Sequence, residues 1–154
     1  MIRIHPLSEV MDSPILGCVI IAWALAQLLK IPTYWFVEKR LNWRRAFEAG
    51  GMPSSHTASA VSLSAMVGAL EGYNTSAFAI CLVLSCIVMY DATHVRRETG
   101  HQGAVINEIL RKVFVDGQPI SDDDLKEIVG HTPLEVFFGF LLGIAVALVY
   151  LQTL

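Results

Sequence analysis

Four apolar stretches, separated by polar links, constrain this chain more than any other feature of its sequence. The first, Ser13 to Leu29, is about as long as a helix must be to cross the hydrocarbon core of a bilayer. The others are Thr57 to Leu70, Ser76 to Tyr90 and Pro133 to Leu151. Hydrophobic residues make up 54% of the chain and charged residues only 16%, which leaves little polar surface for a soluble monomer. The sequence therefore predicts an all-α integral membrane protein.

A soluble all-helical core is the alternative, because two of the four stretches are shorter than about 18 residues. For the first stretch a cleaved signal peptide is a further alternative, but the chain lacks a basic start and a small-residue cleavage pattern after the stretch. We expect one membrane-embedded domain over residues 1–154, a helical bundle with about four transmembrane spans.

Two of the stretches have small residues at every fourth position, a spacing that lets membrane helices approach closely. These residues are Ala60, Ser64 and Gly68 in the second stretch and Gly139, Gly143 and Ala147 in the fourth. A lipid-facing helix would be bulkier, so we place residues 57–70 at the centre of the bundle. We also expect a homodimer that packs through one of these two small-residue faces.

The long polar link from Ala92 to His131 is predicted to contain short amphipathic helices over Val105–Phe114 and Ser121–Val129. The three cysteines lie in apolar stretches without paired metal spacing, and we expect them to be small buried hydrophobic residues. The net charge of −3 gives no indication of nucleic-acid binding.

If all four stretches span, both chain ends lie on one side of the membrane and the two long links lie on the other. Of the 11 Lys and Arg residues, all but Arg3 are on these links, and basic loops favour the cytoplasmic side. A phosphate site would also gather such residues, so the sidedness has two explanations. The topology brings these residues to one face: Lys30, Arg44, Arg45, Ser54, Ser55, His56, His94, Arg96, Arg97, His101 and His131.

The stretch GGMPSSHTASA, from Gly50 to Ala60, is the most unusual part of the links. Glycine and proline favour a special backbone turn, and Ser54 or Ser55 can cap the helix that follows. A helix N-terminus presents free N–H groups and partial positive charge, so it can bind an anion. A plain capped helix start after a flexible loop is the alternative.

Three motifs in order, GGMPSSHTA, IVMYDATHVRRETGHQ and GHTPLEVFFGFLLGI, resemble the type 2 phosphatidic acid phosphatase superfamily. They look most like its divergent bacterial and plant branch, which is related to acid phosphatases and vanadium-dependent haloperoxidases. The resemblance covers roughly residues 13–150. It implies a membrane phosphatase that hydrolyses a lipid phosphate monoester through a phosphohistidine intermediate, without an obligatory cofactor. A non-catalytic membrane protein that binds lipid phosphates is the alternative.

The resemblance also implies roles for individual residues. His131 would be the nucleophile, Glu135 its orienting acid where the family has Asp, and His56 the proton donor. Ser54, and Ser55 in place of the usual glycine, would bind phosphate through their backbone. The first family motif, Lys-x6-Arg-Pro, is not present, and the basic candidates for phosphate binding are Lys30, Lys39, Arg44, Arg45, Arg96 and Arg97.

Several of these residues also have ordinary explanations. Lys30 could snorkel at the end of a span, and His131 could be an interfacial helix cap. Glu135 could bond a neighbouring helix, although a charge one turn into a span is more often functional. Asp91, His94 and His101 cluster after the third stretch and could bind a divalent metal; the alternative is that Asp91 only caps the helix or pairs with the arginines. Arg96 and Arg97 could be anchors at the membrane edge.

Overall fold

The computed structural model of the chain describes residues 12–39, 41–47, 50–93, 103, 106 and 132–154, and of Arg45 and Ala46 the backbone only. Its elements are α2 (Pro14–Glu38), the 3-10 helix η1 (Trp43–Phe47), α3 (Ser55–Glu71), α4 (Ser76–Thr93) and α6 (Pro133–Leu151). Every regular element in these described parts is a helix, which confirms the predicted all-α bundle. The two short helices predicted between residues 105 and 129 lie, except for Ile106, outside the described residues.

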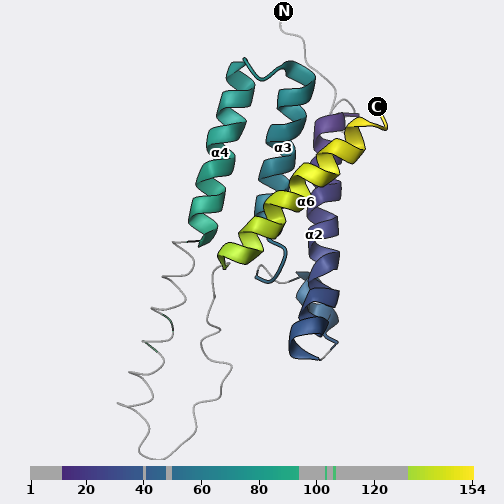
Figure 1. Ribbon diagram of the computed structural model, residues 1–154, viewed down its shortest axis with the longest axis vertical. Helices are drawn as coiled ribbons and strands as arrows, with labels where there is room; N and C mark the ends of the chain where they lie inside the picture. Colours follow the sequence, from purple (N-terminus) through teal and green to yellow (C-terminus); the bar gives the residue numbers. More distant parts are fainter. Residues whose placement is uncertain (1–11, 40, 48–49, 94–102, 104–105, 107–131) are drawn as a thin grey trace, which may run out of the picture.

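The four long helices alternate in direction, as Figure 1 shows. The start of α2, the turn between α3 and α4 and the end of α6 lie at one end of the bundle. The starts of α3 and α6 and the end of α4 lie toward the opposite end. The helix ends that border the two long links therefore lie at the same end of the bundle, as predicted. This end is called the link end below.

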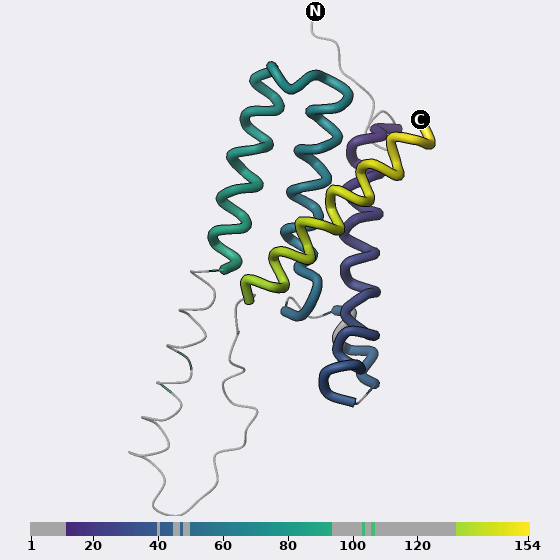
Figure 2. Tube along the Cα trace, in the orientation of Figure 1, coloured from purple at the N-terminus to yellow at the C-terminus, as the bar shows by residue number. Residues whose placement is uncertain are grey.

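Helix α3 is the centre of the bundle and contacts α2, α4 and α6, an arrangement that can be followed in Figure 2. Ten of its residues are buried, from Ser55 to Gly68, as expected for a helix rich in small residues. Among the described helices, α2, α4 and α6 are long and apolar enough to cross a membrane. Helix α3, with 17 residues, is shorter and lies enclosed by them.

Helix α6 packs closely on α3 through its glycines. A β-carbon at Gly139 would lie 2.6 Å from the carbonyl oxygen of Ser54, and one at Gly143 would lie 2.7 Å from that of Ala58. Neither position can accept a side chain unless the backbones move apart. The Gly139 and Gly143 face is thus used within the chain, so the prediction that it packs a homodimer is wrong.

The second small-residue face, on α3, packs against α4. The Ser85 hydroxyl of α4 donates a hydrogen bond to the Ala60 carbonyl oxygen over 2.7 Å, and the Ser64 and Ser85 hydroxyl oxygens are 2.7 Å apart. Hydrogen bonds between hydroxyl groups and backbone stabilise contacts between membrane helices by about 0.6–2 kcal/mol each. Because this face is also occupied, the predicted dimer through it is wrong, and dimerisation through another surface stays a prediction.

Helix α2 is longer than its sequence pattern indicated. The apolar stretch ends at Leu29, but the helix continues through Pro32 to Glu38. The Thr33 hydroxyl lies within hydrogen-bond distance of the carbonyl oxygens of Leu29 and Lys30, which are in the turn around the proline. Pro32 itself lacks the N–H that would bond the Leu28 carbonyl oxygen, and the helix continues past this one missing bond. The polar link after the first apolar stretch therefore begins after Glu38, and not directly after Leu29 as the sequence pattern indicated.

The outward surfaces of α2, α4 and α6 are apolar, as a lipid environment requires. On α4, Ile80 is 68% exposed and Ile87 is 59% exposed. Cys86 is exposed on this helix, whereas Cys18 is buried and Cys81 is partly buried. The prediction that all three cysteines are buried is therefore wrong for Cys86, which adds to an apolar surface instead of the core.

Candidate functional site

The turn before α3 has a backbone that its sequence favours. Gly51 has a φ of +97°, a conformation that side chains with a β-carbon rarely adopt, and the Met52–Pro53 peptide bond is cis. Ser54 is the N-cap of α3, and its hydroxyl accepts hydrogen bonds from the backbone N–H and the hydroxyl of Thr57. Of the two predicted caps, Ser54 is therefore the one that is used. Residues 50–56 are called the PSSH turn below.

The PSSH turn is attached to α2. The Thr33 hydroxyl contacts the carbonyl oxygen of Met52 at hydrogen-bond distance. Beside it, the Lys30 side chain lies along Gly51, where a β-carbon would be 3.7 Å from both Cγ and Cδ of the lysine. Lys30 is only 2% exposed, so its ammonium group does not snorkel to water, and that explanation is wrong. The structure instead places a buried cationic side chain against this turn.

The turn is also attached to α6. The Ser54 backbone N–H donates a hydrogen bond to the Glu135 carbonyl oxygen, with 2.9 Å between the two atoms. This N–H group already has a protein acceptor, so the prediction that it binds phosphate is not supported. Within the described part of the chain, the neighbouring Ser55 N–H has no such acceptor. Ser55 is the better candidate of the two because it is the first residue of α3.

Glu135 and Thr132 form a capping box at the start of α6. The Glu135 Oε2 atom accepts a hydrogen bond from the Thr132 backbone N–H over 3.0 Å, and the Glu135 N–H donates to the Thr132 hydroxyl over 3.3 Å. Thr-Pro-Leu-Glu has the spacing of this motif, so the sequence carries a signal for the cap that the predicted roles of Glu135 did not include. The relation of Glu135 to His131 lies outside the described residues.

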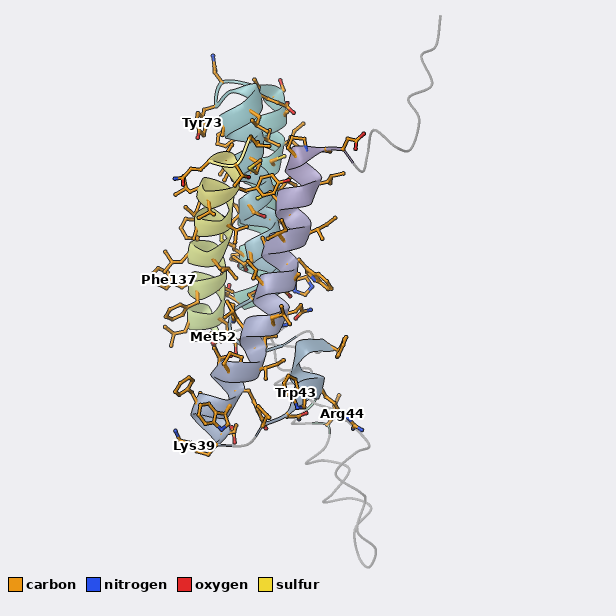
Figure 3. All side chains as sticks on the ribbon, turned by 90° about the vertical axis from the view of Figure 1, so that its right-hand side faces the viewer. Lys39, Trp43, Arg44, Met52, Tyr73 and Phe137 are labelled. Carbon is orange, nitrogen blue, oxygen red and sulfur yellow. The ribbon has the colours of Figure 1, made fainter. Side chains whose placement is uncertain are left out.

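The basic candidates separate in space. Lys39 is the C-cap of α2 and is exposed, with its Nζ atom 6.0 Å from the centre of the Phe36 ring. Arg44 is exposed on η1. Figure 3 shows Lys39 and Arg44 farther out than Met52 at the link end of the bundle. Neither side chain meets the PSSH turn in this arrangement. The Arg45 side chain lies outside the described part of the chain, so Lys30 is the basic candidate that is shown at the turn.

Of the remaining predicted site residues, only some lie in the described part of the chain. His56 is exposed in the first turn of α3, and Asp91 is half-buried near the end of α4. His131, Arg96, Arg97, His94 and His101 lie outside the described residues. Among the residues that are described, none form a group of three acidic, histidine or cysteine side chains that could hold a metal ion. The proposed metal cluster and the proposed nucleophile are therefore untested by the geometry.

Comparison with known proteins gave two matches. Residues 11–146 match the family described as the divergent PAP2 family. The chain is 40% identical over 134 residues to an uncharacterized membrane protein, YuiD, of Bacillus subtilis (strain 168), covering 80% of this chain and 85% of the relative. No solved structure matches the chain.

Proposed function

This chain belongs to the divergent PAP2 family, and on that premise we propose that it is a membrane phosphatase that hydrolyses a lipid phosphate monoester. The observation that supports this proposal best is the buried Lys30 against the PSSH turn, at the start of α3. An ammonium group held against a turn can form charge-assisted hydrogen bonds to the oxygens of an anion. A turn that combines this cation with a helix N-terminus suits a phosphate group.

Residues from three helices supply the proposed site. Helix α2 provides Lys30, α3 provides Ser55 and His56, and the start of α6 provides Glu135. The two attachments of the PSSH turn, to Thr33 and to the Glu135 carbonyl oxygen, support a fixed geometry. Fixed donors stabilise the charge of a transition state better than donors that must reorganise during the reaction.

In the proposed reaction, an imidazole nitrogen of His131 attacks phosphorus as the bond to the leaving alkoxide breaks. His56 gives its proton to that oxygen, so the alcohol leaves neutral, and the phosphoryl group remains on His131. His56 then takes a proton from water as the water attacks the phosphohistidine, which releases phosphate and restores His131. Lys30 and the Ser55 N–H would bind the phosphoryl oxygens throughout both steps.

The test is phosphate release from a panel of native lipid phosphates by the purified full chain. We expect His131→Ala and His56→Ala each to abolish release, and acid-labile phosphate to accumulate on the protein only when His131 is present. If wild type and both variants are equally inactive across the panel but still bind lipid phosphate, the enzyme proposal fails. The chain would then be a non-catalytic lipid-phosphate-binding protein.

We propose that the link end faces the cytoplasm, because nine of the 11 Lys and Arg residues lie on the long links, and Lys30, in α2, lies against the PSSH turn at the same end. Single cysteines at Asn74 and Gly117, in a background without the three native cysteines, test this in intact cells. We expect an impermeant reagent to label Asn74 and not Gly117. Labelling of Gly117 from outside would place the site on the external face.

A further inference from the structure

A second surface at the link end is built from aromatic and basic residues on the end of α2 and on η1. We define it as the 35–47 surface, from the described residues 35–39 and 41–47. Its large apolar side chains are unusually exposed: Trp35 47%, Phe36 65%, Val37 78%, Leu41 59%, Trp43 67% and Phe47 91%. Lys39 and Arg44 are exposed among them. This surface takes no part in the reaction proposed above.

The length of α2 places this surface relative to the membrane. A helix rises about 1.5 Å per residue, and about 20 residues cross a hydrocarbon core of about 30 Å. Helix α2 has 25 residues, so a span that starts at Pro14 reaches the opposite boundary near Thr33. The 35–47 surface then lies just past that boundary, at the depth of the lipid headgroups.

The composition of the surface fits that depth. Tryptophan is enriched at the membrane interface because its ring is apolar and its N–H group is polar. In the sequence, residues 35–47 contain four basic residues and one acidic residue, the exposed Glu38, which leaves an excess of three positive charges (WFVEKRLNWRRAF). An exposed patch with this charge attracts anionic lipid headgroups, and a protein partner would have to match both its charge and its depth.

We infer that the 35–47 surface docks on the anionic phospholipids of the bilayer in which the chain is embedded, on the membrane side where the PSSH turn lies. Helix η1 contacts α2, and Figure 3 shows Trp43 and Arg44 on one side of the end of α2 and Lys39 on the other, so the surface surrounds this end of the helix. The aromatic rings sit in the headgroup layer and the basic side chains bind the lipid phosphates. The consequence is a local enrichment of anionic lipid beside the PSSH turn.

The three tryptophans of the chain make the inference testable. Full-length variants that keep only Trp43, or only Trp23 as the mid-span control, are reconstituted in phosphatidylcholine vesicles with and without phosphatidylglycerol. We expect bromines near the headgroup to quench Trp43 most strongly and bromines deep in the chains to quench Trp23. We also expect brominated phosphatidylglycerol to quench the fluorescence of Trp43 more strongly than brominated phosphatidylcholine does. The two lipids should quench Trp23 equally.

Charge variants separate lipid recognition from simple burial. In the Trp43-only chain, Lys39→Gln and Arg44→Gln should each reduce the preference for phosphatidylglycerol by up to about fivefold, and added salt should reduce it further. Quenching of Trp43 by aqueous iodide, with none by brominated lipid, would overturn the inference. Shielding of Trp43 from both, increasing with the ratio of protein to lipid, would also overturn it, because a second copy would then cover the surface.

Discussion

The backbone N–H of Ser54 donates a hydrogen bond to the carbonyl oxygen of Glu135, with 2.9 Å between the atoms. This bond joins the two family motifs that lie farthest apart in the sequence, PSSH and HTPLE. It is possible because α6 approaches the N-cap of α3 at Gly139, where no side chain separates the backbones. The geometry of the site therefore depends on a glycine that carries no functional group.

Replacement of Gly139 with alanine should separate α3 from α6. The new β-carbon would lie 2.6 Å from the backbone oxygen of Ser54 and 3.0 Å from the Thr57 β-carbon, so one helix must move. We expect a loss of about 1–3 kcal/mol in unfolding free energy, typical of overpacking, measured by denaturation in mild detergent. Gly103→Ala is the matched control, because within the described part of the chain a β-carbon there has no neighbour within 4 Å. Equal stability of the two variants would contradict the close packing.

Two variants distinguish the capping role of Glu135 from its proposed catalytic role. Glu135→Gln keeps a side chain that can accept the Thr132 N–H, so the melting temperature should change little. The loss of charge should reduce phosphate release by roughly 10³- to 10⁴-fold if the carboxylate orients and stabilises the imidazolium of His131. Thr132→Ala is the reverse control: it weakens the cap by about 1 kcal/mol and keeps the carboxylate. An active Glu135→Gln variant would leave Glu135 with the capping role alone.

Lys30 should matter for anion binding at the PSSH turn. Lys30→Met keeps most of the volume of the side chain along Gly51 and removes its charge, and circular dichroism checks that the variant keeps its helices. We expect the affinity for inorganic phosphate, measured by calorimetry, to fall about 10- to 100-fold. Lys39→Met, at the exposed end of α2, serves as the control and should retain the affinity. Equal affinities would remove Lys30 from the site.

Thr33 should position the PSSH turn through the carbonyl oxygen of Met52. Thr33→Val has nearly the same shape and lacks the hydroxyl, so the turn loses this attachment to α2. We expect a fall of about tenfold or more in kcat for a lipid phosphate with a smaller change in KM, because a misplaced site affects chemistry most. Thr33→Ser restores the hydroxyl and should restore kcat. Failure of serine to do so would show that the shape of the side chain, and not its hydrogen bond, is what matters.

The sequence alone determined the class of the fold and the approximate extent of α3, α4 and α6. Apolar stretches set the three long membrane helices, and α6 begins and ends at the predicted residues Pro133 and Leu151. Small residues at every fourth position identified α3 as the central helix. These features are local, since length, hydropathy and proline position act within a single element. The three sequence motifs are likewise sufficient to identify the family.

Only the tertiary structure determined which of these helices and side chains pack against one another. A stripe of small residues indicates that another helix packs closely against it, but it does not show whether that helix belongs to the same chain. Here Gly139 packs against the Ser54 backbone of the same chain. In the same way, Lys30 and Lys39 are equally basic in the sequence. The continuation of α2 past Pro32 puts Lys30 against Gly51 and carries Lys39 away from the PSSH turn. These positions depend on packing and hydrogen bonds between segments that are distant in the sequence. A sequence pattern within one segment therefore cannot predict them.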